Sequence, residues 1–268
     1  MSSTPSAFTV QVQGAPAAVL RLDPPSGAKP QPTPILFLHG WGVSSDLMKP
    51  LAERMAALGY TGIIPDFPGF GDTPPPPTAW AVRDYARWTL DVMNAMQVAR
   101  AHLFAHSFGA RVSLFLASAS ADRFDKVALT GAAGIPTPKP LVARLRLHLY
   151  KSFRSGLRRI GADGLSRQLG DWYSRRYGSA DYQAASGIMR ETFLKVVNED
   201  LRPVAAQVSR PTLLFWGALD QDTPLWQGKA LEKLIPDAGL IVYDDDDHYA
   251  YLRRHTEITR TLDHFYRH

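Results

Sequence analysis

The chain has 268 residues, of which 45% are hydrophobic and 21% charged, and its formal net charge is +5. This apolar content can bury a large core, as one domain with an insertion or as two small domains. The absence of cysteine excludes disulfides, thiol catalysis and thiolate metal sites. No apolar run reaches the length of a membrane span, about 18 residues, and no secretory signal is recognisable, so we expect a cytoplasmic protein.

Eight short apolar runs predict β-strands, and several are continuous rather than alternating, which is typical of strands buried on both faces. A short turn containing Gly14 separates the first two runs and predicts an antiparallel hairpin at one edge of the sheet. The runs are Phe8–Val12, Ala17–Leu22, Ile35–Leu38, Gly62–Ile64, Ala101–Ala105, Lys126–Thr130, Thr212–Trp216 and Leu240–Tyr243.

Helical periodicity separates the later runs. Apolar residues at helical spacing mark helices over Leu47–Leu58, Val82–Met96 and Val112–Ala119, and Gly59 is placed to end the first of them. Alternating strands and helices predict the α/β class, a mostly parallel eight-stranded sheet with helices on both faces.

This alternation stops between Ile135 and Arg202, where no strand pattern occurs. We therefore divide the chain into a core, residues 1–135 and 203–268, and a helical insertion, residues 136–202, folded over one end of the sheet. One long helix of the insertion carries an apolar stripe, made of Leu141, Leu145, Leu149, Phe153, Leu157 and Ile160.

The most informative motif is Ala105-His106-Ser107-Phe108-Gly109, which lies where an apolar strand runs into an apolar helix. A serine at such a tight turn is exposed at the end of the sheet, and its neighbours must be small. The pattern departs from the usual Gly-x-Ser-x-Gly at Ala105. The alternative is a serine that only caps the following helix.

A serine nucleophile needs donors for the oxygen that becomes negative. The turn His39-Gly40-Trp41-Gly42 follows a central strand, so the N–H groups of Trp41 and Phe108 are candidates for an oxyanion hole. We interpret His39 as a structural residue that holds this loop by hydrogen bonds, because a base is better supplied elsewhere.

A serine nucleophile also needs a base and an acid that orients it. Asp220 follows the seventh strand and His248 follows the eighth, so both belong to the same end of the sheet as Ser107. Asp222 is the rival acid, with capping of the next helix as its alternative role. His248 ends an acidic run, Asp244–Asp247, most of which we expect to point into water.

These residues together resemble the α/β-hydrolase fold family, and the resemblance spans nearly the whole chain. It implies an eight-stranded sheet, a Ser107–Asp220–His248 triad in the order typical of this fold, and a variable cap at residues 136–202. The matching pieces are His39-Gly40-Trp41-Gly42, Asp66-Phe67-Pro68-Gly69-Phe70-Gly71, the Ser107 pentapeptide, Asp220 with Thr223-Pro224, and His248.

The family's habit of placing the apolar face of the cap over the serine predicts a substrate pocket with aliphatic and aromatic walls. Its candidate residues are Gly40, Leu141, Leu145, Trp172, Met189 and Phe193. The cap is also basic, with ten Lys or Arg and two acids between Lys139 and Arg176. A solvated polar face is the favoured interpretation, and contact with an anionic substrate or lipid surface is the alternative.

The sequence thus predicts a serine hydrolase for a carboxylic ester of moderate size, acting through an acyl-enzyme without metal or organic cofactor. Its partners are a small-molecule ester and at most a second copy of the chain, with no nucleic acid and no membrane span. Carbon–carbon bond hydrolysis by the same triad, or ligand binding without turnover, are the alternative functions.

Overall fold

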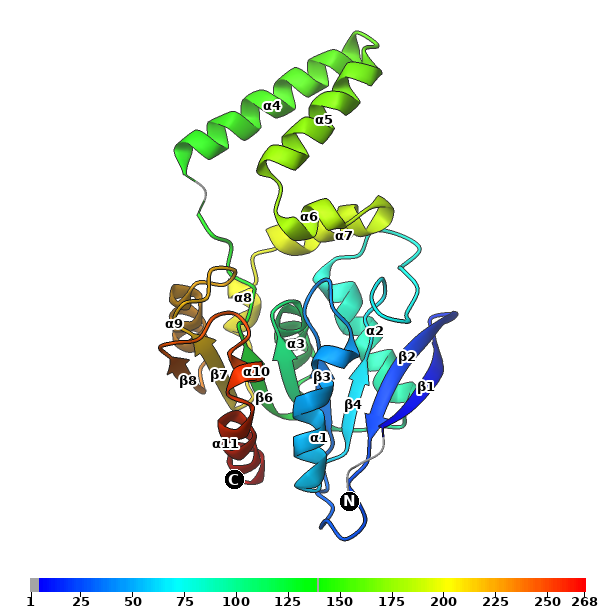
Figure 1. Cartoon of the computed structure of the whole chain (residues 1–268), viewed down its shortest axis with the longest axis vertical. Helices are drawn as coiled ribbons and strands as arrows, with labels where there is room; N and C mark the ends of the chain where they lie inside the picture. Colours follow the sequence, from blue (N-terminus) through cyan, green and yellow to red (C-terminus); the bar gives the residue numbers. More distant parts are fainter. Residues whose placement is uncertain (1–4, 139) are drawn as a thin grey trace.

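The computed structural model describes residues 5–138 and 140–268, in which eight strands form one sheet (Figure 1). The strand order is β1-β2-β4-β3-β5-β6-β7-β8. The strands are β1 (Pro5–Val12), β2 (Ala15–Leu22), β3 (Ile35–Leu38), β4 (Gly62–Pro65), β5 (Ala101–His106), β6 (Phe124–Thr130), β7 (Thr212–Gly217) and β8 (Ala238–Tyr243).

Strand β2 is antiparallel to both of its neighbours, β1 and β4, and all other neighbouring pairs are parallel. This confirms the mostly parallel eight-stranded sheet and the antiparallel edge hairpin. The central strands β3, β4 and β5 are buried along their whole length, which explains their continuous apolar runs.

The helices cover both faces of the sheet. Helices α1 and α11 bury one apolar cluster with residues such as Leu51 and Leu262, and α2, α3 and α9 bury the other with residues such as Val92 and Leu231. The core helices are α1 (Lys49–Ala57), α2 (Val82–Ala95), α3 (Phe108–Ala119), α8 (Arg202–Ala205), α9 (Leu225–Leu234), α10 (Ala250–Arg253) and α11 (His255–Arg267), with 3-10 turns η1 (Ser45–Leu47) and η2 (Ala121–Arg123).

Four helices lie between β6 and α8 and stand above one end of the sheet (Figure 1). They are α4 (Leu141–Arg159), α5 (Asp163–Tyr177), α6 (Ala180–Ala184) and α7 (Gly187–Asn198). Helices α6 and α7 lie close to the core, whereas α4 and α5 form a hairpin that projects away from it (Figure 1). The division of the chain into a core and an insertion with limits at residues 136 and 202 stays a prediction.

Candidate active site

Ser107 occupies a strained turn between β5 and α3. Its φ and ψ are 51° and −106°, a sparsely populated conformation that costs a non-glycine residue about 1–3 kcal/mol. Its side chain makes no capping hydrogen bond to α3, so the capping alternative has no support here. The small neighbour is required, because a Cβ on Gly109 would lie 2.3 Å from the carbonyl oxygen of Leu38. Strain of this kind is found at functional turns.

Two backbone N–H groups beside Ser107 are available to a ligand. Phe108 is the first residue of α3, so its N–H has no partner inside the helix and lies at the positive end of the helix dipole. The N–H of Trp41 donates to no acceptor within the described residues. The two residues are neighbours, with their ring centroids 5.4 Å apart.

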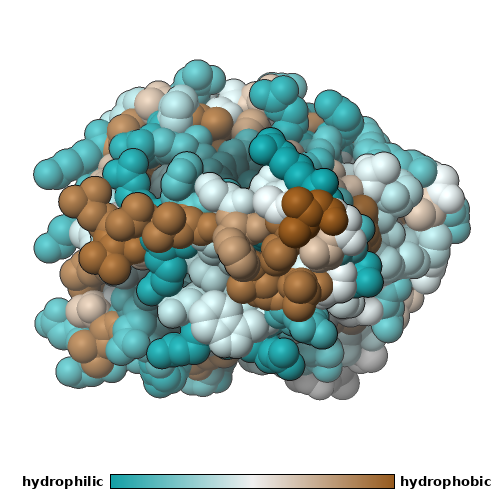
Figure 2. Space-filling model, turned by 90° about the horizontal axis from the view of Figure 1, so that it is seen from above, coloured by the Kyte–Doolittle hydropathy of each residue, from teal (hydrophilic) through white to brown (hydrophobic). Residues whose placement is uncertain are grey.

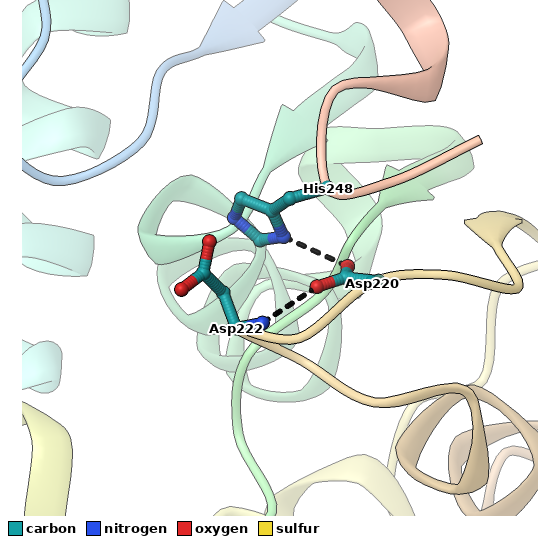
Figure 3. A group of neighbouring side chains, drawn as sticks. All are labelled: Asp220, Asp222 and His248. Carbon is teal, nitrogen blue, oxygen red and sulfur yellow. Dashed lines mark hydrogen bonds and ion pairs between the residues drawn. The ribbon is translucent and has the colours of Figure 1, made fainter.

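His248 and Asp220 form a buried pair. The Nδ1 of His248 lies 2.8 Å from Oδ2 of Asp220, and the two side chains are 8% and 0% exposed (Figure 3). Since a carboxylate can only accept, Nδ1 carries the proton. In the neutral ring, this tautomer leaves the lone pair that a general base requires on Nε2 of His248.

Asp220 is held rigidly by its own loop. Its Oδ1 accepts the N–H groups of Asp222 and Thr223, at 2.9 and 2.8 Å, and its Oδ2 accepts the hydroxyl of Thr223 at 2.7 Å. Thr223 therefore belongs to the site. In the sequence it was included in the motif with Asp220 and Pro224 but was assigned no role. Asp222 is exposed and does not cap α9, which begins after Pro224 without a side-chain cap.

The turn after β6 connects Ser107 with His248. The N–H of Ser107 donates to the carbonyl of Thr130 at 3.1 Å, and the next residue, Gly131, lies against the ring of His248. On the other side, Nε2 of His106 donates to the carbonyl of His248 at 3.2 Å. Burial holds the pKa of His106 well below its usual range, so this ring stays neutral. No pattern in the sequence indicates these roles of Gly131 and His106.

Gly131 has a conformation and an environment that only glycine fits. Its φ is 50°, and a Cβ would lie 2.9 Å from Nδ1 of His248. We expect Gly131→Ala to lower kcat by at least about tenfold, because the methyl group displaces the ring by a distance that disturbs catalysis. The control is Gly14→Ala, where φ is 81° but the space is open.

Both substitutions should destabilise the fold by about 1–2 kcal/mol, since both place alanine at a positive φ, and Gly131→Ala should destabilise it further because its methyl group collides with His248. Thermal denaturation measures the stability of each variant, and ester hydrolysis at a temperature where both are folded separates their activities. Equal activities of Gly131→Ala and Gly14→Ala would show that the turn after β6 does not position His248.

His39 is structural, as predicted. Its Nε2 accepts the N–H of Phe67 at 3.0 Å, and its Nδ1 donates to the carbonyl of Gly40 at 2.7 Å. Burial lowers the pKa of His39 to about 4, so the ring is neutral at pH 7 and both nitrogens are used by the loop.

Two carboxylates add negative charge near His248. A carboxylate oxygen of Asp222 lies within 4.8 Å of the ligand atoms of Asp220 and His248 (Figure 3). Asp181 of α6 interacts with the charges of Asp222 and His248. Its partial burial, followed by the charge of Asp222, raises the pKa of Asp181, and His248 acts in the opposite direction. An anionic group near His248 is therefore disfavoured.

Only Asp244 and Asp245 of the acidic run before His248 point into water as expected, because Asp247 pairs with Arg253 and Asp246 is buried. Asp244 and Asp245 are exposed, but Asp246 is 2% exposed and accepts hydrogen bonds from Arg253 at 2.7 Å and Arg254 at 2.5 Å. Burial opposes the charge of Asp246, but the two guanidinium groups outweigh it and lower the pKa. Asp246 thus anchors the His248 loop to α10 instead of pointing into water.

One predicted pocket residue, Gly40, lies beside Ser107, and two others, Phe193 and Met189, lie against Trp41 and Gly69. A Cβ on Gly40 would lie 3.6 Å from Cβ of Ser107. Phe193 of α7 is 9% exposed, and its ring centroid is 5.2 Å from that of Trp41. Met189, on the same helix, packs its sulfur against Gly69. Helix α7 therefore supplies a wall beside the Trp41 loop.

The structure does not bring the other three pocket residues to Ser107. Leu141 and Leu145 are 78% and 60% exposed, and Trp172 is 54% exposed. The physical reason is that α4 and α5 pack against each other and project from the core (Figure 1). The expected covering of the serine by the apolar face of α4 is therefore not observed.

Asp220, Asp222 and His248 are also the one group with metal-ligand spacing among the described residues. However, Nδ1 of His248 is already bonded to Asp220, and three further donors saturate that carboxylate. Binding a metal there would break these bonds. The donor set therefore fits an imidazole–carboxylate pair better than a metal centre.

Comparison with known proteins agrees with this architecture. The family model described as alpha/beta hydrolase fold matches residues 33–203. The chain belongs to the α/β-hydrolase fold family. As an α/β-hydrolase fold protein it has relatives of several activities.

The chain is 24% identical over 247 residues to a pimeloyl-[acyl-carrier protein] methyl ester esterase of Chromobacterium violaceum, covering 85% of this chain and 92% of that one. It is 25% identical over 240 residues to a 2-hydroxy-6-oxo-6-phenylhexa-2,4-dienoate hydrolase of Burkholderia cepacia, covering 81% of each. Among solved structures, an esterase of Exiguobacterium antarcticum superposes with a TM-score of 0.73 at 20% identity, over 98% of this chain and 100% of that one.

Proposed function

We propose that this α/β-hydrolase fold protein is a serine hydrolase that cleaves a carboxylic ester of moderate size through an acyl-enzyme. The observation that carries the proposal is the buried 2.8 Å bond between His248 and Asp220, which the turn after β6 connects to a serine in a strained turn. A molecule that only bound a ligand would gain nothing from the cost of that strain and of a buried, oriented imidazole.

In this mechanism, Nε2 of His248 takes the proton of Ser107 as its hydroxyl attacks the ester carbonyl. Asp220 keeps the ring in the required tautomer and stabilises the imidazolium that forms. The N–H groups of Trp41 and Phe108 stabilise the oxyanion. His248 then gives this proton to the oxygen of the leaving alcohol as the acyl-enzyme forms. In the second half-reaction it takes a proton from water, which attacks the acyl-enzyme, and returns that proton to Ser107 as the acid is released.

Electrostatics favour a neutral ester over an anionic substrate. The Burkholderia cepacia relative is named as a hydrolase of a dienoate, a substrate that carries a carboxylate. The exposed carboxylate of Asp222 would repel such a group if it lay near His248, although solvent screens this repulsion. Ester hydrolysis, the activity named for the Chromobacterium violaceum relative, does not require a negatively charged group near His248.

Two measurements on the purified chain test the proposal. A fluorophosphonate should label the protein with one adduct, located by mass spectrometry on the peptide that contains Ser107. A series of p-nitrophenyl esters of increasing acyl length should give a maximum of kcat/KM at a moderate length. A protein that bound the esters but released no p-nitrophenol and took no label would be a receptor, and the proposal would fail.

A further inference from the structure

The α4–α5 hairpin leaves a large apolar surface uncovered. Its exposed residues include Leu141 (78%), Val142 (75%), Leu145 (60%), Leu149 (59%), Phe153 (65%) and Ile160 (78%) around α4, and Leu165 (58%) and Trp172 (54%) on α5. Viewed from the hairpin side, apolar side chains form a band bordered by hydrophilic ones (Figure 2). Continuous exposed apolar surface of this kind marks a contact with another molecule or with lipid.

Helical geometry explains why this stripe is free. At 100° per residue, the half-buried residues of α4, such as Leu147, Tyr150 and Leu157, share one face. Tyr150 stacks on Tyr173 with ring centroids 3.9 Å apart, which fixes that face of the hairpin. The exposed apolar stripe occupies the adjacent third of α4, and α5 covers it only in part: Leu149 and Phe153 line an open hollow with Trp172 of α5.

A basic face borders the stripe on its other side. Arg144, Lys151 and Arg158 are exposed and fall within one 40° sector of α4. Helices α4 and α5 together carry nine Arg or Lys and two Asp, a net charge of +7; the whole chain carries +5, so all other residues sum to −2. No ion pair within residues 5–138 and 140–268 includes an Arg or Lys of this hairpin.

We propose that the α4–α5 hairpin docks on the surface of an anionic lipid bilayer. An apolar stripe with Leu, Phe and Trp beside an Arg/Lys face is the pattern of a helix that lies in the interface plane. The stripe enters the boundary between headgroups and acyl chains, while the long basic side chains extend to the lipid phosphates. Within the described residues, no helix has the length and hydropathy to cross the bilayer, so the contact is peripheral.

Charge favours lipid over the other occupants of this surface. Two copies of the chain joined through their hairpins would bring two groups of net charge +7 together without counter-charge. Closure of the hairpin onto the core would bury the stripe but gives the basic face no role. An anionic bilayer buries the apolar stripe and supplies negative charge to the basic face. Each Lys or Arg near its surface strengthens binding about fivefold. The proposal does not depend on the activity of Ser107.

Sedimentation with vesicles tests the proposal on the full chain. The probes are extruded vesicles of phosphatidylcholine alone and of phosphatidylcholine with phosphatidylglycerol at a ratio of about 7:3. We expect at least about tenfold stronger partition to the anionic vesicles, decreasing as salt rises and the Debye length falls below about 8 Å. Equal or absent partition to the two vesicles at low salt would overturn the proposal.

Two sets of variants separate the contribution of the basic face from that of the apolar stripe. Arg144→Glu with Lys151→Glu and Arg158→Glu should lose at least about tenfold in partition to anionic vesicles. The matched control reverses the same number of exposed charges on the core, Arg87→Glu with Lys229→Glu and Lys233→Glu, and should retain most of the binding. Leu145→Asn with Leu149→Asn and Phe153→Asn should lose binding at every salt concentration. Equal losses in the control and the Arg144 set would contradict docking through the hairpin.

The absence of cysteine allows a direct measurement of depth. Leu149→Cys, labelled with an environment-sensitive dye, should shift its emission to the blue on anionic vesicles, whereas a label at Lys229→Cys should not. Sedimentation equilibrium without lipid tests whether a second copy of the chain binds this surface instead. A concentration-dependent dimer that the Leu145 set abolishes, together with no dye shift on vesicles, would assign the surface to a second copy of the chain instead.

Discussion

Replacing Ser107 by alanine should lower kcat for ester hydrolysis by a factor of about 10³ or more and abolish labelling by fluorophosphonates. The variant loses the nucleophile but keeps the oxyanion donors and the pocket, so some activity above that of water remains. Circular dichroism and thermal denaturation should show an intact fold, because the hydroxyl of Ser107 makes no hydrogen bond among the described residues.

The double variant Ser107→Ala with His248→Ala is the sharper form of this experiment. If the two residues act as a unit, adding the second substitution to the first should change kcat little, since the base has no function without its nucleophile. Losses that multiply would mean that His248 acts on a step in which Ser107 takes no part. Wild-type activity in Ser107→Ala would disprove the proposed nucleophile.

The sequence predicted the central part of the fold well because burial leaves a direct pattern there. The run Ile35–Leu38 coincides with β3, whose four residues are all buried. The edge strand β1 begins at Pro5, three residues before the predicted start at Phe8, because its residues are mostly exposed and backbone pairing with β2 defines it instead. Pairing with a neighbour leaves no signal in hydropathy.

The same limit explains what could not be predicted about the cap. The apolar stripe of α4 has one periodicity whether it packs on the core or faces solvent, so the sequence could not distinguish a pocket wall from a free surface. Similarly, the four residues of the run Asp244–Asp247 are all aspartate, so the sequence does not distinguish the one that is buried. Only the positions of Arg253 and Arg254, seven and eight residues further along the chain, select Asp246 for burial.

The placement of the candidate site was predictable for a different reason. The carboxyl ends of parallel strands meet at one edge of the sheet, so Ser107 after β5, Asp220 after β7 and His248 after β8 must converge. Their supporting contacts were not predictable. The carbonyl of His248 accepts from His106, and Gly131 touches its ring, through folding of segments more than 100 residues apart.

Asp220→Asn and Asp222→Asn should have very different effects, although the two residues are two positions apart. Asp220→Asn should lower kcat by about 10³- to 10⁴-fold, since an amide NH₂ facing Nδ1 favours the wrong tautomer of His248. It also leaves the hydroxyl of Thr223 and two backbone N–H groups with a poorer acceptor. Asp222→Asn keeps all of these bonds, because Asp222 contributes its backbone N–H to them.

For Asp222→Asn we therefore expect kcat within about threefold of the unmodified chain, and a change in pH dependence instead. Its carboxylate, within 4.8 Å of the His248–Asp220 pair, favours the imidazolium. Removing that charge should extend activity to lower pH, moving the acid limb of the kcat/KM profile downward. Asp181→Asn should move it in the same direction by less, since its carboxyl is already biased toward the neutral form by partial burial, which raises its pKa. A larger loss of kcat in Asp222→Asn than in Asp220→Asn would transfer the orienting role to Asp222, and an upward shift of the acid limb would contradict the electrostatic argument.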